Sequence, residues 1–133
     1  MAEYQIRLVG GPEKELATLS TTEDEDRCHI DFCYRGHAIE AEADDYFEAF
    51  CEIRLQLEKE GLLPFCYGAS HNVYPSGMAR GTGAGLKAYK LEKGKQARSK
   101  DLVEIFTEGP DVIPASVALQ KQFYDEWFDG LTA

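Results

Sequence analysis

The chain has 133 residues, 44% of them hydrophobic, and this length is enough for one compact domain, spanning residues 1–133, with a single core. Its formal net charge of −10 argues against nucleic acid as a partner, because phosphate neutralisation dominates that kind of binding. No apolar run approaches the roughly 20 residues that a membrane helix needs, and the first residues, MAEYQIRLVG, lack the pattern of a signal peptide. We therefore expect a cytoplasmic protein with no membrane partner.

The charge is distributed unevenly along the chain. Residues 1–70 carry 16 acidic and 6 basic side chains, whereas residues 80–100 carry seven basic side chains against Glu92 alone. Residues 101–133 return to a net charge of −6. This pattern predicts a polarised surface that steers a charged partner, and a basic protein is the partner that the net charge favours.

Two hairpins are predicted in the first third of the chain. Tyr4, Ile6 and Leu8 alternate with polar residues, GGPEK then turns the chain, and residues 16–19 form the second strand. The stretch STTEDEDR, residues 20–27, contains no apolar side chain and is expected to be a solvated acidic loop.

The second hairpin joins residues 28–34 to residues 37–43 through Arg35-Gly36, a dipeptide suited to a tight two-residue turn. The register that this turn imposes pairs Phe32 with Ile39 on an apolar face. It gathers polar side chains on the opposite face, namely His29, Asp31, Glu40 and Glu42. A flat strand face offers no enclosing geometry for a metal ion, so we expect no metal site on this hairpin. We also expect no cofactor elsewhere in the chain.

A helix is predicted over residues 44–61, with apolar residues at helical spacing, acidic residues in its first turn and Gly61 at its end. The outer face of this helix adds Glu48 and Glu52 to the negative charge of the hairpin. The candidate acidic surface therefore consists of Asp31, Glu40, Glu48 and Glu52.

Residues 66–89, CYGASHNVYPSGMARGTGAGLKAY, contain the glycine-rich segment of the chain, between strands expected at residues 62–70 and 85–92. A phosphate-binding loop would need a lysine directly after the last glycine and a helix behind it, and neither is present. Cys66, His71 and Asn72 are the residue types of a thiol hydrolase, but neighbouring side chains of an extended segment point apart. Long connections in small domains are often functional. The candidate binding residues are His71, Asn72, Tyr74, Arg80 and Lys87.

The last part of the chain contains a short apolar run at residues 102–106, compatible with a strand or a helical turn, and a terminal helix that begins at Pro114. This helix offers several large apolar side chains for burial, including Leu119, Trp127 and Phe128. The four cysteines (Cys28, Cys33, Cys51 and Cys66) form no CxxC pair, so we expect reduced thiols and no zinc site.

Together these elements predict an α+β fold: a mostly antiparallel sheet of six to seven strands with two helices packed on one face. In size and charge alone the chain resembles small acidic immunity or inhibitor proteins, and no motif identifies a family. This resemblance implies a protein-binding module without catalytic residues. The alternative is an enzyme or a protein that binds a small anionic molecule, in which Arg80 and Lys87 hold an anion beside the glycine-rich segment.

Overall fold

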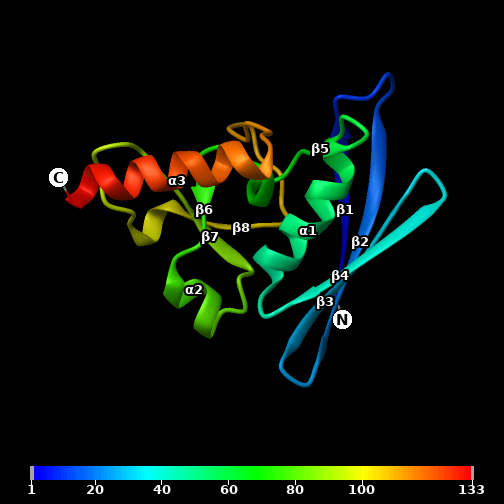
Figure 1. Cartoon of the computed structure of the whole chain (residues 1–133), viewed down its shortest axis with the longest axis horizontal. Helices are drawn as coiled ribbons and strands as arrows, with labels where there is room; N and C mark the ends of the chain where they lie inside the picture. Colours follow the sequence, from blue (N-terminus) through cyan, green and yellow to red (C-terminus); the bar gives the residue numbers. More distant parts are fainter. Residues whose placement is uncertain (1, 133) are drawn as a thin grey trace.

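The computed structural model describes residues 2–132, which form two antiparallel sheets and three α-helices (Figure 1). The five-stranded sheet has the order β4-β3-β2-β1-β5, and the three-stranded sheet has the order β6-β7-β8. The bounds of the first sheet's strands are β1 Ala2–Val9, β2 Glu15–Asp24, β3 Arg27–Tyr34, β4 His37–Ala43 and β5 Leu63–Pro64. The remaining elements are β6 Val73–Tyr74, β7 Lys87–Lys90, β8 Leu102–Glu104, α1 Tyr46–Glu58, α2 Gly77–Thr82 and α3 Val117–Thr132.

The α+β class is confirmed, but the expected single sheet with two helices is wrong. The strands that follow α1 are only two to four residues long and pair with one another, except that β5 joins the edge of the first sheet beside β1. Short strands carry too little alternation for their partners to be recognised from the sequence. The fold therefore consists of two sheets with separate helices rather than one continuous layer.

The N-terminal meander follows the predicted hairpins closely. β3 and β4 pair in the predicted register, with Phe32 opposite Ile39 and Asp31 opposite Glu40. Arg35 and Gly36 at the turn both have positive φ values, 51° and 73°, as a primed turn requires. The acidic loop expected at residues 20–27 is wrong in part, since β2 continues to Asp24 and pairs with β3 along this stretch. Backbone pairing with β3 thus extends the strand despite the lack of apolar residues.

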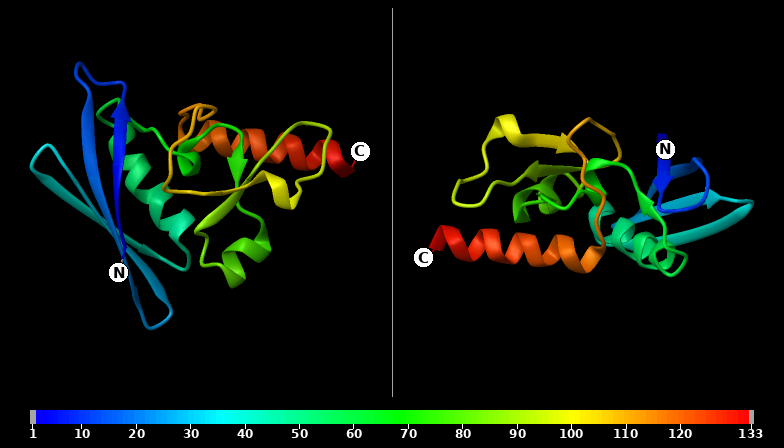
Figure 2. Two further views of the ribbon diagram at one scale, coloured as in Figure 1. Left: turned by 180° about the vertical axis from the view of Figure 1, so that it is seen from behind. Right: turned by 90° about the horizontal axis from the view of Figure 1, so that it is seen from above.

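Helix α1 covers one face of the five-stranded sheet, as Figure 2 shows from two further sides. Its side chains Phe47, Phe50, Ile53 and Leu57 are fully buried. The helix begins after Asp45, whose carboxylate accepts a hydrogen bond from the Glu48 backbone N–H at 2.8 Å. Such a cap satisfies one of the backbone donors that every helix start leaves unpaired.

The glycine-rich segment is folded rather than a structureless connection. It contains a 3₁₀ turn at Tyr67–Ala69, strand β6, helix α2 and the start of β7. Gly85 has a φ of +74°, and a Cβ atom there would lie 2.8 Å from the Asp45 carboxylate. The Tyr46 N–H donates to the Ala84 carbonyl at 2.7 Å, so the end of the glycine run is fixed against the start of α1.

A buried arginine connects α1 to α3. Arg54 is 1% exposed and donates to the Gln120 side-chain oxygen at 2.6 Å, to the Ala115 carbonyl at 3.0 Å and to the Gly68 carbonyl at 3.2 Å. Gln120, also 1% exposed, donates its amide to the carbonyls of Gly68, Ser70 and Val73. Helix α3 is therefore held along the three-stranded sheet by polar contacts, and its C-terminal end points away from the five-stranded sheet (Figure 1).

The buried side chains of both sheets belong to one hydrophobic cluster, which extends from Ile6 in β1 to Phe106 after β8. No helix within residues 2–132 is long and apolar enough to cross a membrane.

Candidate functional site

An apolar groove of about 460 Å³ lies between helix α3 and the three-stranded sheet. Its wall on the sheet side comes from Tyr74 in β6 and from Tyr89 and Leu91 in and after β7, and its wall on α3 comes from Tyr124, Trp127 and Phe128. We call this feature the aromatic groove. Phe128 is 50% exposed and lies beside the other aromatic side chains of this wall.

The two walls of the aromatic groove meet where Tyr74 packs against Tyr124. The rings of Tyr74 and Tyr124 stack with their centroids 4.2 Å apart at 19°, and the Phe47 ring of α1 meets Tyr74 edge-on at 5.0 Å. The Arg80 guanidinium of α2 lies 5.7 Å from the Tyr74 ring centroid and 3.7 Å from the buried Asp45 carboxylate. Stacked and edge-on rings are favourable arrangements that fix the orientation of each ring. Tyr74 is thus a partly buried wall residue rather than the tip of an exposed loop.

A second cavity, of about 750 Å³, adjoins the aromatic groove and shares Leu91 and Gln96 with it. Four cationic side chains line it together with three carboxylates: Lys90, Lys95, Arg98 and Lys100, and Glu92, Asp101 and Asp111. We call it the charged cavity. Most of its lining comes from the last part of the basic stretch, in the loop between β7 and β8.

This loop is attached to α3 and to the glycine-rich segment. The Trp127 indole N–H donates to the Lys95 carbonyl at 2.8 Å, and Lys93 forms an ion pair with Glu126 at 2.7 Å. On the other side, the Leu91 N–H donates to the Asn72 carbonyl at 2.7 Å. Both cavities are therefore built from segments that the fold brings together from distant parts of the chain.

The five candidate binding residues do not converge on one cavity. Tyr74 lines the aromatic groove and Asn72 lines the charged cavity, so two of them lie at adjoining sites. His71 packs edge-on against Phe123 of α3 at 4.8 Å, and Arg80 is held by Asp45. Lys87 is exposed on β7 opposite Glu104 and lines neither cavity. An anion held jointly by Arg80 and Lys87 has no support in this arrangement.

The thiols offer no reactive nucleophile beside a base. Cys66 is 1% exposed, and burial raises the pKa of its thiol to about 12. Burial also raises the pKa of Cys51. Within residues 2–132 no hydrogen bond joins a cysteine to a histidine side chain. All four cysteines are free thiols, as predicted.

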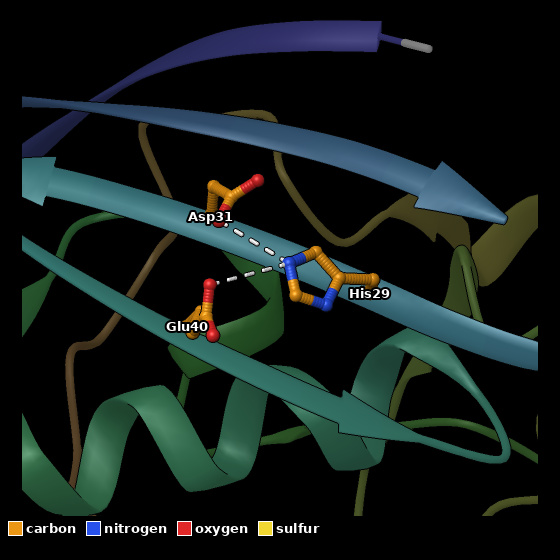
Figure 3. Close-up of side chains that lie close together, drawn as sticks. All are labelled: His29, Asp31 and Glu40. Atoms are coloured by element: carbon orange, nitrogen blue, oxygen red, sulfur yellow. Dashed lines mark hydrogen bonds and ion pairs between the residues drawn. The ribbon is translucent and has the colours of Figure 1, made fainter. Parts of the chain in front are cut away.

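The outer face of the β3–β4 hairpin brings His29, Asp31 and Glu40 together (Figure 3). The His29 Nε2 atom lies 3.2 Å from an Asp31 oxygen and 3.8 Å from a Glu40 oxygen, and one ligand atom from each residue falls within 4.8 Å of the others. Nitrogen and carboxylate ligands at this spacing are compatible with a transition metal. They are equally compatible with an ion pair to a protonated histidine, and Glu42 faces Arg27 at 3.6 Å instead of completing a fourth position.

The candidate acidic surface is divided between two sides of the molecule. Asp31 and Glu40 lie on the face of the sheet opposite the core, whereas α1, which carries Glu48 and Glu52, packs on the core face. In Figure 3 the ribbon of α1 is on the far side of the hairpin from His29. The four residues of the candidate acidic surface are therefore separated by the sheet, because α1 packs on the apolar face of the hairpin, opposite the face that carries Asp31 and Glu40.

The sequence signals for the aromatic groove were present but were interpreted as core. The terminal helix was expected to bury its large apolar side chains, yet Leu119 and Phe128 are 52% and 50% exposed while the polar Gln120 is buried. The basic stretch did mark Arg98 and Lys100, which the candidate residues left out.

Comparison with protein families finds no family model that matches the chain. Comparison with curated proteins finds no significant similarity.

Proposed function

We propose that this protein is a binding module that recognises a segment of another protein in the aromatic groove. The observation that carries the proposal is the open row of aromatic side chains, with Phe128 half exposed, between α3 and the three-stranded sheet. Aromatic side chains are the residues that most often anchor protein interfaces, because they bury large areas at a small cost in conformational entropy.

The shape of the groove supports a chain segment as its ligand. Its wall on α3 runs from Tyr124 to Leu131, a span of seven helical steps that covers about 10 Å along the helix axis. An extended peptide advances about 3.3 Å per residue, so about three residues would fit along this wall. Grooves of this kind bind extended or polyproline segments through aromatic contacts.

The chemistry of the lining supports binding rather than catalysis. The groove is lined by aromatic, aliphatic and small polar residues, with no cysteine, histidine or carboxylate among its described lining. Ser76 carries the one serine or threonine hydroxyl among the described lining residues. Its oxygen already accepts a hydrogen bond from the Ala79 N–H as the cap of α2. A serine nucleophile needs an adjacent base, which this lining does not provide.

The four free thiols support a reducing compartment, and we propose that the module acts in the cytoplasm.

Selection from a phage-displayed random peptide library against the full chain tests the function. The enriched peptides should lose at least about tenfold in affinity for Phe128→Ser, because truncating an aromatic anchor removes more than about 1.4 kcal/mol of binding. Leu119→Ser is the matched control, since Leu119 lies on the same helix with a similar exposed fraction but outside the groove.

The proposal is contradicted if no peptide is enriched, or if the enriched peptides bind Phe128→Ser as tightly as the unmodified protein. It is supported if Leu119→Ser binds the enriched peptides as tightly as the unmodified protein does, while Phe128→Ser binds them more weakly.

A further inference from the structure

The aromatic groove does not end at a neutral surface. It continues past Leu91 and Gln96 into the charged cavity, so a segment that lies along α3 reaches the cationic loop between β7 and β8. The local charge, rather than the net charge of −10, then decides which partner sequence is accepted.

The cations of the charged cavity fall into two groups. Lys90 pairs with Asp111 at 3.1 Å, and Lys95 pairs with Glu92 at 3.3 Å. The charges of these two lysines are thus already balanced within the molecule.

Arg98 and Lys100 differ from these lysines. Both are exposed, and neither side chain forms an ion pair within the described part of the chain. The nearby Asp101 carboxylate accepts the backbone N–H of Arg98 at 3.0 Å, which caps the 3₁₀ turn at Ser99–Asp101. Two cationic groups therefore remain available at the end of an apolar groove.

We propose that the partner segment carries an aromatic residue that fills the groove and, close to it in sequence, one or two carboxylates that pair with Arg98 and Lys100. This inference rests on the proposed function and specifies its ligand. A guanidinium binds a carboxylate through two parallel hydrogen bonds, so Arg98 supplies direction as well as charge. The same pair disfavours a basic segment, which would place like charges together at the end of the groove.

An acidic peptide fits the site better than a nucleic acid does. Three carboxylates line the charged cavity beside the four cations, and the whole chain carries a charge of −10. A polyphosphate backbone would bring many negative charges against these groups, whereas a peptide segment would bring only one or two carboxylates, which can pair with Arg98 and Lys100. Single-stranded nucleic acid, which also stacks on aromatic side chains, is the competing ligand that the experiment must distinguish.

The test uses fluorescein-labelled synthetic peptides with a phenylalanine anchor in a glycine-serine frame. A pair of glutamates is placed before or after the anchor, within about four residues, and matched series carry glutamine or lysine pairs instead. Fluorescence anisotropy with the full chain at about 50 mM salt should show the best glutamate peptide binding at least about tenfold more tightly than its glutamine and lysine counterparts, because weak screening preserves the charge contacts.

Variants of the protein assign this preference to the two cations. Arg98→Glu/Lys100→Glu should reverse the preference toward the lysine peptides, and Arg98→Gln/Lys100→Gln should remove it. Lys14→Glu/Lys59→Glu is the control, because it changes the net charge by the same amount at exposed lysines outside both cavities. This control should retain the preference for glutamate.

The outcomes separate the inference from the proposed function. Equal binding of all three peptide series, weakened throughout by Phe128→Ser, would overturn the inference and leave the groove as a peptide site. Absence of binding by every anchored peptide would also overturn the inference, and the library selection then decides the proposed function independently. Tighter binding of a short single-stranded oligothymidylate, lost in Arg98→Glu/Lys100→Glu, would overturn it in favour of nucleic acid.

Discussion

Replacing Gln120 by alanine should destabilise the protein far more than the loss of a polar helix residue usually does. Gln120 is 1% exposed, and its side chain is both the acceptor for Arg54 and the donor to three backbone carbonyls. Within residues 2–132 no carboxylate forms an ion pair with Arg54, and burial lowers the pKa of its guanidinium. The amide oxygen at 2.6 Å is therefore the shortest contact that compensates this buried charge.

The magnitude follows from the contacts that the alanine cannot make. A hydrogen bond to a charged group contributes about 1.5–3 kcal/mol, and each buried carbonyl left without a donor costs about 1 kcal/mol or more. The expected loss is about 3–5 kcal/mol, a large part of the roughly 5–15 kcal/mol by which a domain of this kind is stable. At about 3 °C per kcal/mol for this chain length, the melting temperature should fall by about 10–15 °C.

Urea unfolding followed by far-UV circular dichroism measures this loss. Gln122→Ala is the control on the same helix, because Gln122 is exposed and bonds only to Glu126 at the surface, so its replacement should cost under about 0.5 kcal/mol. A loss below about 1 kcal/mol for Gln120→Ala would refute the reasoning, since the contacts would then be replaced by water at little cost.

Three further expectations concern other parts of the molecule. Iodoacetamide should label the exposed Cys33 in the native protein at pH 8 and leave Cys66, with its pKa of about 12, unlabelled until unfolding, and early labelling of Cys66 detected by peptide mass spectrometry would contradict its burial. Asp45→Ala should cost about 1–2 kcal/mol in urea unfolding because α1 loses its cap, and an unchanged midpoint would count against that role. Calorimetric titration with Zn²⁺ or Mn²⁺ should detect no tight site on the β3–β4 hairpin, where the Asp31 and Glu40 side chains are 49% and 71% exposed, and a stoichiometric heat that Asp31→Asn abolishes would show otherwise.

The parts of the fold that the sequence predicted are those with local signals. Alternating apolar residues and the Arg35-Gly36 turn determine the register of β3 and β4 without reference to any other part of the chain. The second sheet could not be predicted in this way, because Val73 and Tyr74 form a two-residue strand whose partner, β7, lies more than ten residues later.

The candidate site was predicted only in part, for a reason that lies in α3. Leu119 and Phe128 are nine residues apart, about two and a half helical turns, so they lie on opposite sides of α3 and no orientation of the helix buries both. The side that is buried carries Gln120, whose amide oxygen accepts from Arg54. A contact between residues 66 positions apart leaves no periodic signal in the sequence. Tyr74 was identified as a candidate, whereas its stacking partner Tyr124 was not among the candidate residues.

The indole of Trp127 gives this molecule an intrinsic optical reporter. It is the single tryptophan of the chain, it forms part of the groove wall, and its N–H is bonded to the Lys95 carbonyl of the adjoining loop. Its emission maximum and quantum yield depend on the polarity and hydrogen bonding around the ring, so they should change when a ligand enters or when the loop detaches from α3. Peptides anchored by phenylalanine add no emission of their own at these wavelengths, which allows occupancy to be followed by stopped-flow mixing on the unlabelled protein.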